Sequence, residues 1–162
     1  MAILPLTQGF DNKILRTESK PVKAVDKKIK KLVEDMIATM FDANGIGIAA
    51  SQVGVNLRIY IARLNCDSPH EMIVPMINPK FLKLSKDTDE AEEGCLSLPK
   101  RFGVVERSKT VTIQYTGIKG QSMTLHLDGL NARIMQHEMD HLNATLIADK
   151  FISEEGVEKA AK

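Results

Sequence analysis

Residues 136–141 read QHEMDH and contain the motif HExxH. On a helix, residues four apart lie about one turn apart on the same face, so the rings of His137 and His141 can bind one ion without bending the backbone. Glu138 follows the first histidine and lies beside the same ion. This arrangement is typical of a metal-dependent hydrolase.

The flanking sequence predicts a helix that turns both histidines inward. Asp128 is a good N-cap residue, and Leu130 and Ile134 share one helical face with His137 and His141 at i, i+4, i+7 and i+11. The histidines therefore continue an apolar stripe. The alternative interpretation is a pair of core histidines that bind no metal.

Length and charge restrict the class of protein. The chain has 162 residues, which suits a single domain over 1–162 in which 153–162 form a short helix or a frayed end. With 22 Lys+Arg against 21 Asp+Glu, the net charge of +1 gives no electrostatic case for nucleic acid as the main ligand or for an anionic membrane. We expect the lysines of 23–31 to form a solvated helix face.

Targeting signals are also missing from the sequence. No apolar run approaches the roughly 18 residues that a membrane span needs, and residues 1–9 lack the charged start and apolar stretch of a signal peptide. We therefore expect a cytoplasmic protein with no membrane partner.

Hydrophobic periodicity predicts an amphipathic helix followed by strands. Residues 25–41 carry apolar side chains at helical spacing, with lysines and acids on the other face. Residues 57–61 and 110–115 alternate with a period of two, and so do 123–127, which follow a glycine-bounded turn at 117–120 and should complete a hairpin.

The order of these elements predicts the fold class. Pro75 within 72–77 suggests an edge strand or a bulge. A helix, then strands, then a second helix indicates an α+β fold. We predict mostly antiparallel strands packed around a helix in the C-terminal half that carries HExxH, together with an N-terminal amphipathic helix.

A catalytic zinc-type site keeps three protein ligands and one position for water, so one ligand is still missing. Residues 92–99 read EEGCLSLP and offer Cys95, where Gly94 allows a close backbone approach and Pro99 stiffens the exit. A small buried hydrophobic residue is the ordinary alternative for a cysteine. Cys66 and Cys95 lack CxxC spacing, and we expect both to be reduced, with separate roles.

Residues 45–54 read GIGIAASQVG, which superficially resembles a dinucleotide-binding loop. That interpretation fails because a helix, not a strand, precedes this segment. Small residues instead permit a tight backbone path along which a peptide can lie against exposed main-chain groups. Gln52 supplies one neutral amide donor.

The three motifs GIGIAASQVG, EGCLS and QHEMDH occur in this order, and together they resemble the signatures of the peptide deformylase family. The resemblance extends from about Leu15 to Asp149. It implies hydrolysis of the N-formyl group from the N-terminal formyl-methionine of newly synthesised polypeptides, which releases formate. The implied partners are N-formylmethionyl nascent peptides at the ribosome.

The resemblance also implies a role for each residue of the chemical centre. Cys95, His137 and His141 would bind one divalent ion, with Fe(II) as the expected physiological metal and Zn(II), Ni(II) or Co(II) as compatible ones. Glu138 would act as the general acid and base. Gln52 and the backbone N–H of Leu96 would hold the developing oxyanion.

The resemblance further implies a set of substrate contacts and one buried ion pair. The residues expected to border the peptide backbone are Ile46, Gly47 and Gly94. Those expected to line or flank the methionine pocket are Ile46, Leu130, Arg133 and Ile134. The family layout also suggests a buried pair between Glu93 and Arg107 beneath the cysteine.

Two segments depart from the family pattern. Residues 100–103 read KRFG, so an arginine that usually lies near the cleft is displaced by one position to Arg101, beside Phe102. Residues 143–147 lack the usual glycine and phenylalanine. These departures concern the rim of the substrate site and leave the chemical centre intact.

Two other classes of protein compete with this interpretation. A zincin-like peptidase shares HExxH but takes its third ligand downstream, where the acidic residues are Asp149, Glu154, Glu155 and Glu158. A structural metal domain would use four protein ligands, Cys66, Cys95, His137 and His141, and would leave no position for water.

Overall fold

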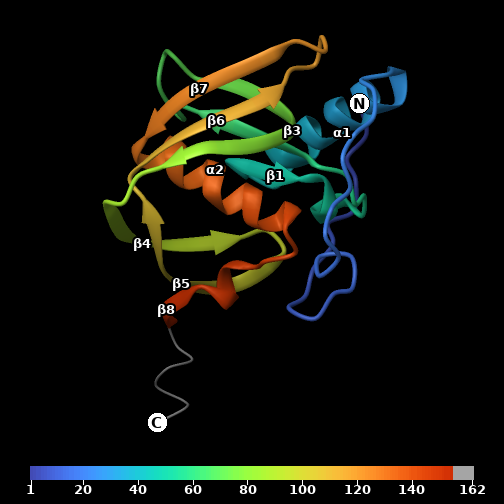
Figure 1. Cartoon of the computed structure of the whole chain (residues 1–162). Coiled ribbons are helices and arrows are strands. Elements are labelled where there is room, and N and C mark those ends of the chain that lie inside the picture. The colour runs from blue at the N-terminus through green and yellow to red at the C-terminus, as the bar shows by residue number, and fades with distance from the viewer. Residues whose placement is uncertain (155–162) are drawn as a thin grey trace.

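The computed structural model describes residues 1–154, which form two layers of strands with a helix between them (Figure 1). The five-stranded sheet has the order β1 (Gly47–Ala49), β2 (Ile59–Leu64), β3 (Met72–Leu84), β6 (Thr110–Thr116) and β7 (Ser122–Asp128). The three-stranded sheet has the order β4 (Thr88–Cys95), β5 (Leu98–Ser108) and β8 (Phe151–Glu154). Two α-helices, α1 (Lys27–Asp42) and α2 (Gly129–Leu142), and two 3₁₀ turns, η1 (Ala50–Val53) and η2 (Ile147–Asp149), complete the described part of the chain.

α2 lies between the two sheets and contacts both of them (Figure 1). Its apolar side chains Met135 and Leu142 are fully buried. Asp128 occupies the N-cap position as expected, but in the described structure its side chain makes no capping hydrogen bond, and Gly129 has a φ of 55°. Packing on two sides, rather than capping, therefore holds this helix in place.

α1 covers one end of the five-stranded sheet. Asp26 caps it by accepting a hydrogen bond from the backbone N–H of Ile29 at 3.0 Å. Met36 and Met40 are fully buried against Ile61 of the sheet, while the lysines lie on the other face. The helix predicted over 25–41 thus begins at Lys27, directly after its cap.

The strands alternate as their sequences indicate. In β6, Val111, Ile113 and Tyr115 are buried, and the intervening polar residues face outward. β6 and β7 form an antiparallel hairpin that pairs Thr110 with Asp128. The pairs in both sheets are antiparallel, so the predicted mixture of helices and antiparallel strands is confirmed.

The edge-strand prediction for Pro75 is confirmed for residues 72–76, which in the described structure pair with β2 alone, although β3 as a whole is an internal strand. β3 lies inside the sheet, between β2 and β6, and Pro75 pairs with Ile61 of β2. β6 pairs with β3 from Ile77 onward, so the missing N–H of Pro75 interrupts no bond to β6. The irregularities of β3 follow Ile77 and Phe81 rather than Pro75.

The end of the described chain also differs from expectation. Ser153 and Glu154 belong to β8, which pairs with Val104 and Gly103 of β5, so a short helix or frayed end over 153–162 is wrong for these two residues. The remaining residues, 155–162, lie outside the described part of the chain. Neither helix among residues 1–154 is both long and apolar enough to cross a membrane.

Truncating a side chain in the core beside α2 should destabilise the protein. Ile113 is fully buried, so Ile113→Ala should lower the free energy of unfolding by about 2–5 kcal/mol through lost burial and a cavity. Leu82→Ala is the matched control, because Leu82 is 51% exposed on β3 and should change the same quantity by only about 0.5 kcal/mol. Urea unfolding followed by circular dichroism measures both, and equal losses would contradict the packing described above.

Candidate active site

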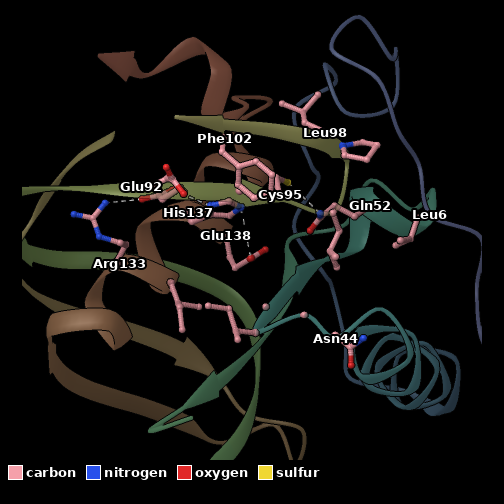
Figure 2. Close-up of a pocket in the computed structure, with 18 of the residues that line it drawn as sticks. Leu6, Asn44, Gln52, Glu92, Cys95, Leu98, Phe102, Arg133, His137 and Glu138 are labelled. Carbon is pink, nitrogen blue, oxygen red and sulfur yellow. Dashed lines mark hydrogen bonds and ion pairs between the residues drawn. The ribbon is translucent and has the colours of Figure 1, made fainter. Parts of the chain in front are cut away.

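One thiol and two imidazoles converge at the junction of β4 and α2. Cys95 ends β4, while His137 and His141 lie one turn apart on α2. The ligand atoms of these three residues all lie within 4.8 Å of one another, and Cys95 Sγ lies 3.3 Å from His141 Nε2. Figure 2 shows Cys95 and His137 side by side above Glu138. The three side chains can hold one ion without rearrangement of the backbone.

The chemistry of this donor set fits a divalent transition metal. Thiolate and imidazole ligands suit Zn, Fe, Ni and Co, and three protein ligands leave a fourth position for water. The buried Oε2 of Glu138 has no hydrogen-bond partner among the described residues. An ion with its water beside Glu138 would supply the partner that this oxygen lacks.

The environment of Cys95 favours its ligand form. Burial by itself opposes ionisation of the thiol, but the nearby rings of His141 and His137 lower the pKa of Cys95 well below its usual value of 9.0. The thiolate, not the thiol, binds metals. Cys95 is thus prepared to coordinate an ion.

Glu93 orients the first histidine from behind. His137 Nδ1 donates to Glu93 Oε1 at 3.0 Å, which leaves Nε2 of the ring for the ion. Arg107 donates to both oxygens of Glu93, at 2.9 and 3.0 Å, and Arg133 Nη1 donates to Oε2 at 2.7 Å. The buried pair predicted between Glu93 and Arg107 is confirmed.

These donors keep Glu93 ionised. Burial by itself would raise the pKa of Glu93, but the hydrogen bonds from His137 and Arg107 hold it far below its usual value. Arg107 also pairs with Asp140 of the QHEMDH motif at 2.5 Å. The sequence does not predict this second contact, because no local spacing relates the two residues.

Glu138 is buried next to Cys95, His137 and His141. Burial raises the pKa of its carboxyl above the usual 4.5, although His137 and His141 act in the opposite direction. Glu138 Oε1 lies 4.0 Å from His137 Nε2. A Cβ at Gly47 would lie 2.5 Å from the same Oε1, so the position facing Glu138 requires glycine.

The side-chain amide of Gln52 points toward the cysteine. Its Oε1 accepts a hydrogen bond from the backbone N–H of Ala49 at 2.8 Å, which fixes the orientation of the amide. Its Nε2 therefore faces Cys95 Sγ at 3.5 Å and Ser97 Oγ at 3.2 Å. Leu96 lies in the turn between β4 and β5, and its carbonyl accepts from Gln8 Nε2 at 3.3 Å.

These groups line one cavity of about 620 Å³. The residues expected at the substrate, all of which contribute to its walls, are Ile46, Gly47, Gly94, Leu130, Arg133 and Ile134. Gln52, Leu96, Cys95, His137 and Glu138 line it as well. Ile46 and Leu130 are 40% and 52% exposed and form its rim, whereas Ile134 is buried. The guanidinium of Arg133 is held by Glu93 and Asp89.

The cavity opens between two strands that each end a sheet. β1 is the first strand of the five-stranded sheet and β4 the first of the three-stranded sheet. Residues 45–47 line one side and 92–95 the other. Leu6 and Gln8 also line the cavity, and the sequence does not predict this because the segment that carries them has no periodic pattern.

Three of the residues that the competing interpretations require, Cys66, Asp149 and Glu154, are engaged elsewhere in the described structure. Cys66 Sγ lies 2.9 Å from the carbonyl of Arg63, and the metal-ligand cluster found among residues 1–154 does not include it. The downstream acids Asp149 and Glu154 pair with Arg16 and Arg101. Glu155 and Glu158 lie outside the described residues.

Known proteins are similar to this chain in both sequence and fold. The sequence model of the polypeptide deformylase family matches residues 5–156. Peptide deformylase of Agrobacterium fabrum is 42% identical over 124 residues, which are 76% of this chain and 72% of that protein. Peptide deformylase of Finegoldia magna is 40% identical over 148 residues, or 90% of each chain.

Two crystal structures extend this similarity to three dimensions. Peptide deformylase from Thermotoga maritima superposes with a TM-score of 0.85 at 38% identity, covering 91% of this chain and 97% of that chain. A class I type b peptide deformylase from Acinetobacter baumannii with Met-ala-ser bound gives a TM-score of 0.84 at 36% identity, covering 93% and 99%. The chain therefore belongs to the peptide deformylase family and is a metal-dependent hydrolase that removes N-formyl groups from peptides.

Proposed function

We propose that the chain removes formate from the N-terminal formyl-methionine of newly made polypeptides, with Cys95, His137 and His141 as the metal ligands. The observation that carries this proposal is a thiol and two imidazoles whose ligand atoms lie within 4.8 Å of one another. Cys95 and His137 line a cavity together with the buried Glu138, and His141 is buried next to them. Three ligands leave a position for water, as hydrolysis requires.

A divalent ion bound by these residues would polarise the formyl carbonyl and activate a water molecule at neutral pH. We propose Fe(II) as the native ion because the family resemblance implies it; the thiolate and imidazole donors also suit Zn(II), Ni(II) and Co(II). Glu93 supports the proposal because it fixes the His137 ring with Nε2 toward Cys95.

Glu138 is proposed as the group that moves the proton. Its carboxylate would accept a proton from the attacking water and return it to the amine nitrogen, without which an amide leaving group stalls. Its burial beside His137 and the close approach of Gly47 support this role, because both fix the carboxylate next to the reacting carbonyl.

Gln52 and the backbone N–H of Leu96 are proposed to stabilise the oxygen as the carbonyl becomes tetrahedral. The amide of Gln52 is held by Ala49 with Nε2 toward Cys95, so this donor is oriented before the substrate binds. Donors that need no reorganisation are the ones that lower such a barrier most.

The substrate is proposed to bind as an additional strand between β1 and β4. Both strands end their sheets and present main-chain groups to the cavity, which is how extended peptides are commonly bound. The methionine side chain would enter the apolar part of the cavity formed by Ile46, Leu130 and Ile134, beside the stem of Arg133. The similar structure of the peptide deformylase from Acinetobacter baumannii has Met-ala-ser bound, which supports a substrate peptide that begins with methionine.

The domain organisation and the cellular location of the protein are also proposals. We infer that residues 1–162 form one metallohydrolase domain and that the protein acts in the cytoplasm on nascent peptides at the ribosome. The support is the family match over residues 5–156 and the action of this family on formylated nascent peptides.

An assay of formate release tests the proposed activity. The metal-loaded protein should hydrolyse formyl-Met-Ala-Ser, because its carbonyl would meet the ion, Gln52 and Glu138 together. Acetyl-Met-Ala-Ser is the control and should react far more slowly, because the cavity wall at the carbonyl must accommodate an additional methyl group. Coupled formate detection gives both rates, and equal rates or no formate would refute the proposal.

Removing the thiolate should release the ion. Cys95→Ala leaves two protein ligands, so we expect the bound metal to fall well below one equivalent. Cys66→Ala is the matched control and should keep its metal, because Cys66 contacts Arg63 rather than the histidines. Elemental analysis of protein purified without oxygen measures the content and identity of the ion. The opposite pattern would show that the ligand assignment is wrong.

Neutralising Glu138 should separate binding from catalysis. Glu138→Gln keeps the shape and the three ligands, so the variant should bind one ion and lose about 10²- to 10⁴-fold in kcat. Glu106→Gln, on the exposed face of β5, is the control and should keep normal turnover. Turnover of Glu138→Gln close to that of the unchanged protein would exclude Glu138 as the proton carrier.

A further inference from the structure

Arg101, the displaced arginine, lies on the opposite face of β5 from Phe102, the residue that follows it. Successive side chains of a strand point to opposite faces, so a shift of one position moves a side chain to the other side of the sheet. Arg101 forms two hydrogen bonds with Glu154 of β8, at 2.7 and 3.0 Å, and its guanidinium lies 5.5 Å from the ring centre of Phe10. Phe102, not Arg101, lines the active-site cavity.

Phe102 lies directly beside the edge where the peptide would bind. It pairs with Gly94 across β4 and β5, and the two residues therefore share one face of the sheet. A Cβ on Gly94 would lie 2.5 Å from Phe102 Cε1, so the ring packs over the backbone of Gly94. The ring is still 45% exposed and is seen among the cavity-lining residues in Figure 2. An exposed aromatic surface thus borders the cleft.

Phe102 lies on one face of the three-stranded sheet, and this face determines which residue of the substrate can reach its ring. Glu93 faces α2, as its contact with His137 shows, so its neighbour Gly94 and the paired Phe102 face the other side. A peptide bound as a strand also alternates, and its methionine side chain is directed toward Leu130 and Ile134 of α2. The side chain of the next residue is then directed away from α2, to the side where Phe102 lies.

We propose that Phe102 makes this enzyme prefer an aromatic or large apolar residue directly after the formyl-methionine. An offset or edge-to-face contact with the exposed ring would bury apolar surface on both sides, whereas glycine at that position would make no such contact. This inference rests on the proposed function and names the class of peptide that the same site takes.

The test compares two substrates rather than one rate. We expect kcat/KM for formyl-Met-Phe-Ala to exceed that for formyl-Met-Gly-Ala by about 2- to 10-fold, the range of an aromatic contact. Phe102→Ala should reduce this ratio toward one, and Phe102→Tyr should restore it. The effect should appear mainly in KM, because the Phe102 side chain takes no part in the proton transfers.

The control is a second exposed phenylalanine. Phe10 is 40% exposed, lies 4.5 Å from the guanidinium of Arg16 and does not line the cavity, so Phe10→Ala should keep the ratio of the unchanged protein. Thermal unfolding and metal content of each variant show that it is folded and loaded. An unchanged ratio in Phe102→Ala, or an equal loss in Phe10→Ala, overturns the inference.

A binding measurement keeps the two proposals separate. The dissociation constants of the product peptides Met-Phe-Ala and Met-Gly-Ala, obtained by calorimetry, need no turnover. Absence of formate from every formylated peptide would refute the proposed function alone. Tighter binding of Met-Phe-Ala that disappears in Phe102→Ala supports the role of Phe102, and equal binding of both peptides overturns it.

Discussion

The site depends on the hydrogen bonds that the buried carboxylate of Glu93 accepts. This carboxylate joins β4 to α2 by accepting hydrogen bonds from His137, Arg107 and Arg133. An unpaired charge at this depth would cost several kcal/mol, so the carboxylate is stable only while all these donors surround it. Their arrangement fixes the three-stranded sheet against the helix. Cys95, two residues further along β4, is thereby placed against both histidines.

The cleft follows from the way in which two sheets enclose one helix. α2 contacts both sheets, and the two strands nearest the cavity, β1 and β4, are each the outermost strand of their sheet. Outermost strands carry unpaired main-chain groups, and proteins usually cover such groups to avoid unwanted pairing. Here these strands border a cavity that is also lined by Cys95, His137 and Glu138. The proposed peptide strand and the proposed metal centre would therefore meet in one place.

Where prediction from the sequence failed, the deciding contacts were between distant segments. β4 carries acidic residues over most of its length, so it shows no alternation of apolar residues and its periodicity does not predict a strand. The buried position of Glu93 was expected from the family layout alone. Pro75 correctly indicated an edge over residues 72–76, but no local signal showed that β6 joins β3 from Ile77 onward. Leu6 and Gln8 reach the cavity from a segment without periodicity, and Phe102 lines it because β5 pairs it with Gly94.

The sequence alone determined the features that arise from local spacing. HExxH places His137 and His141 on one helical face because an α-helix repeats every 3.6 residues, and the alternation in 110–127 determines a hairpin because strands repeat every two. The tertiary structure alone decided how β4 docks on α2, which side of β5 carries Arg101, and which residues border the cleft. These depend on packing between residues far apart in the chain, and no local period encodes such contacts.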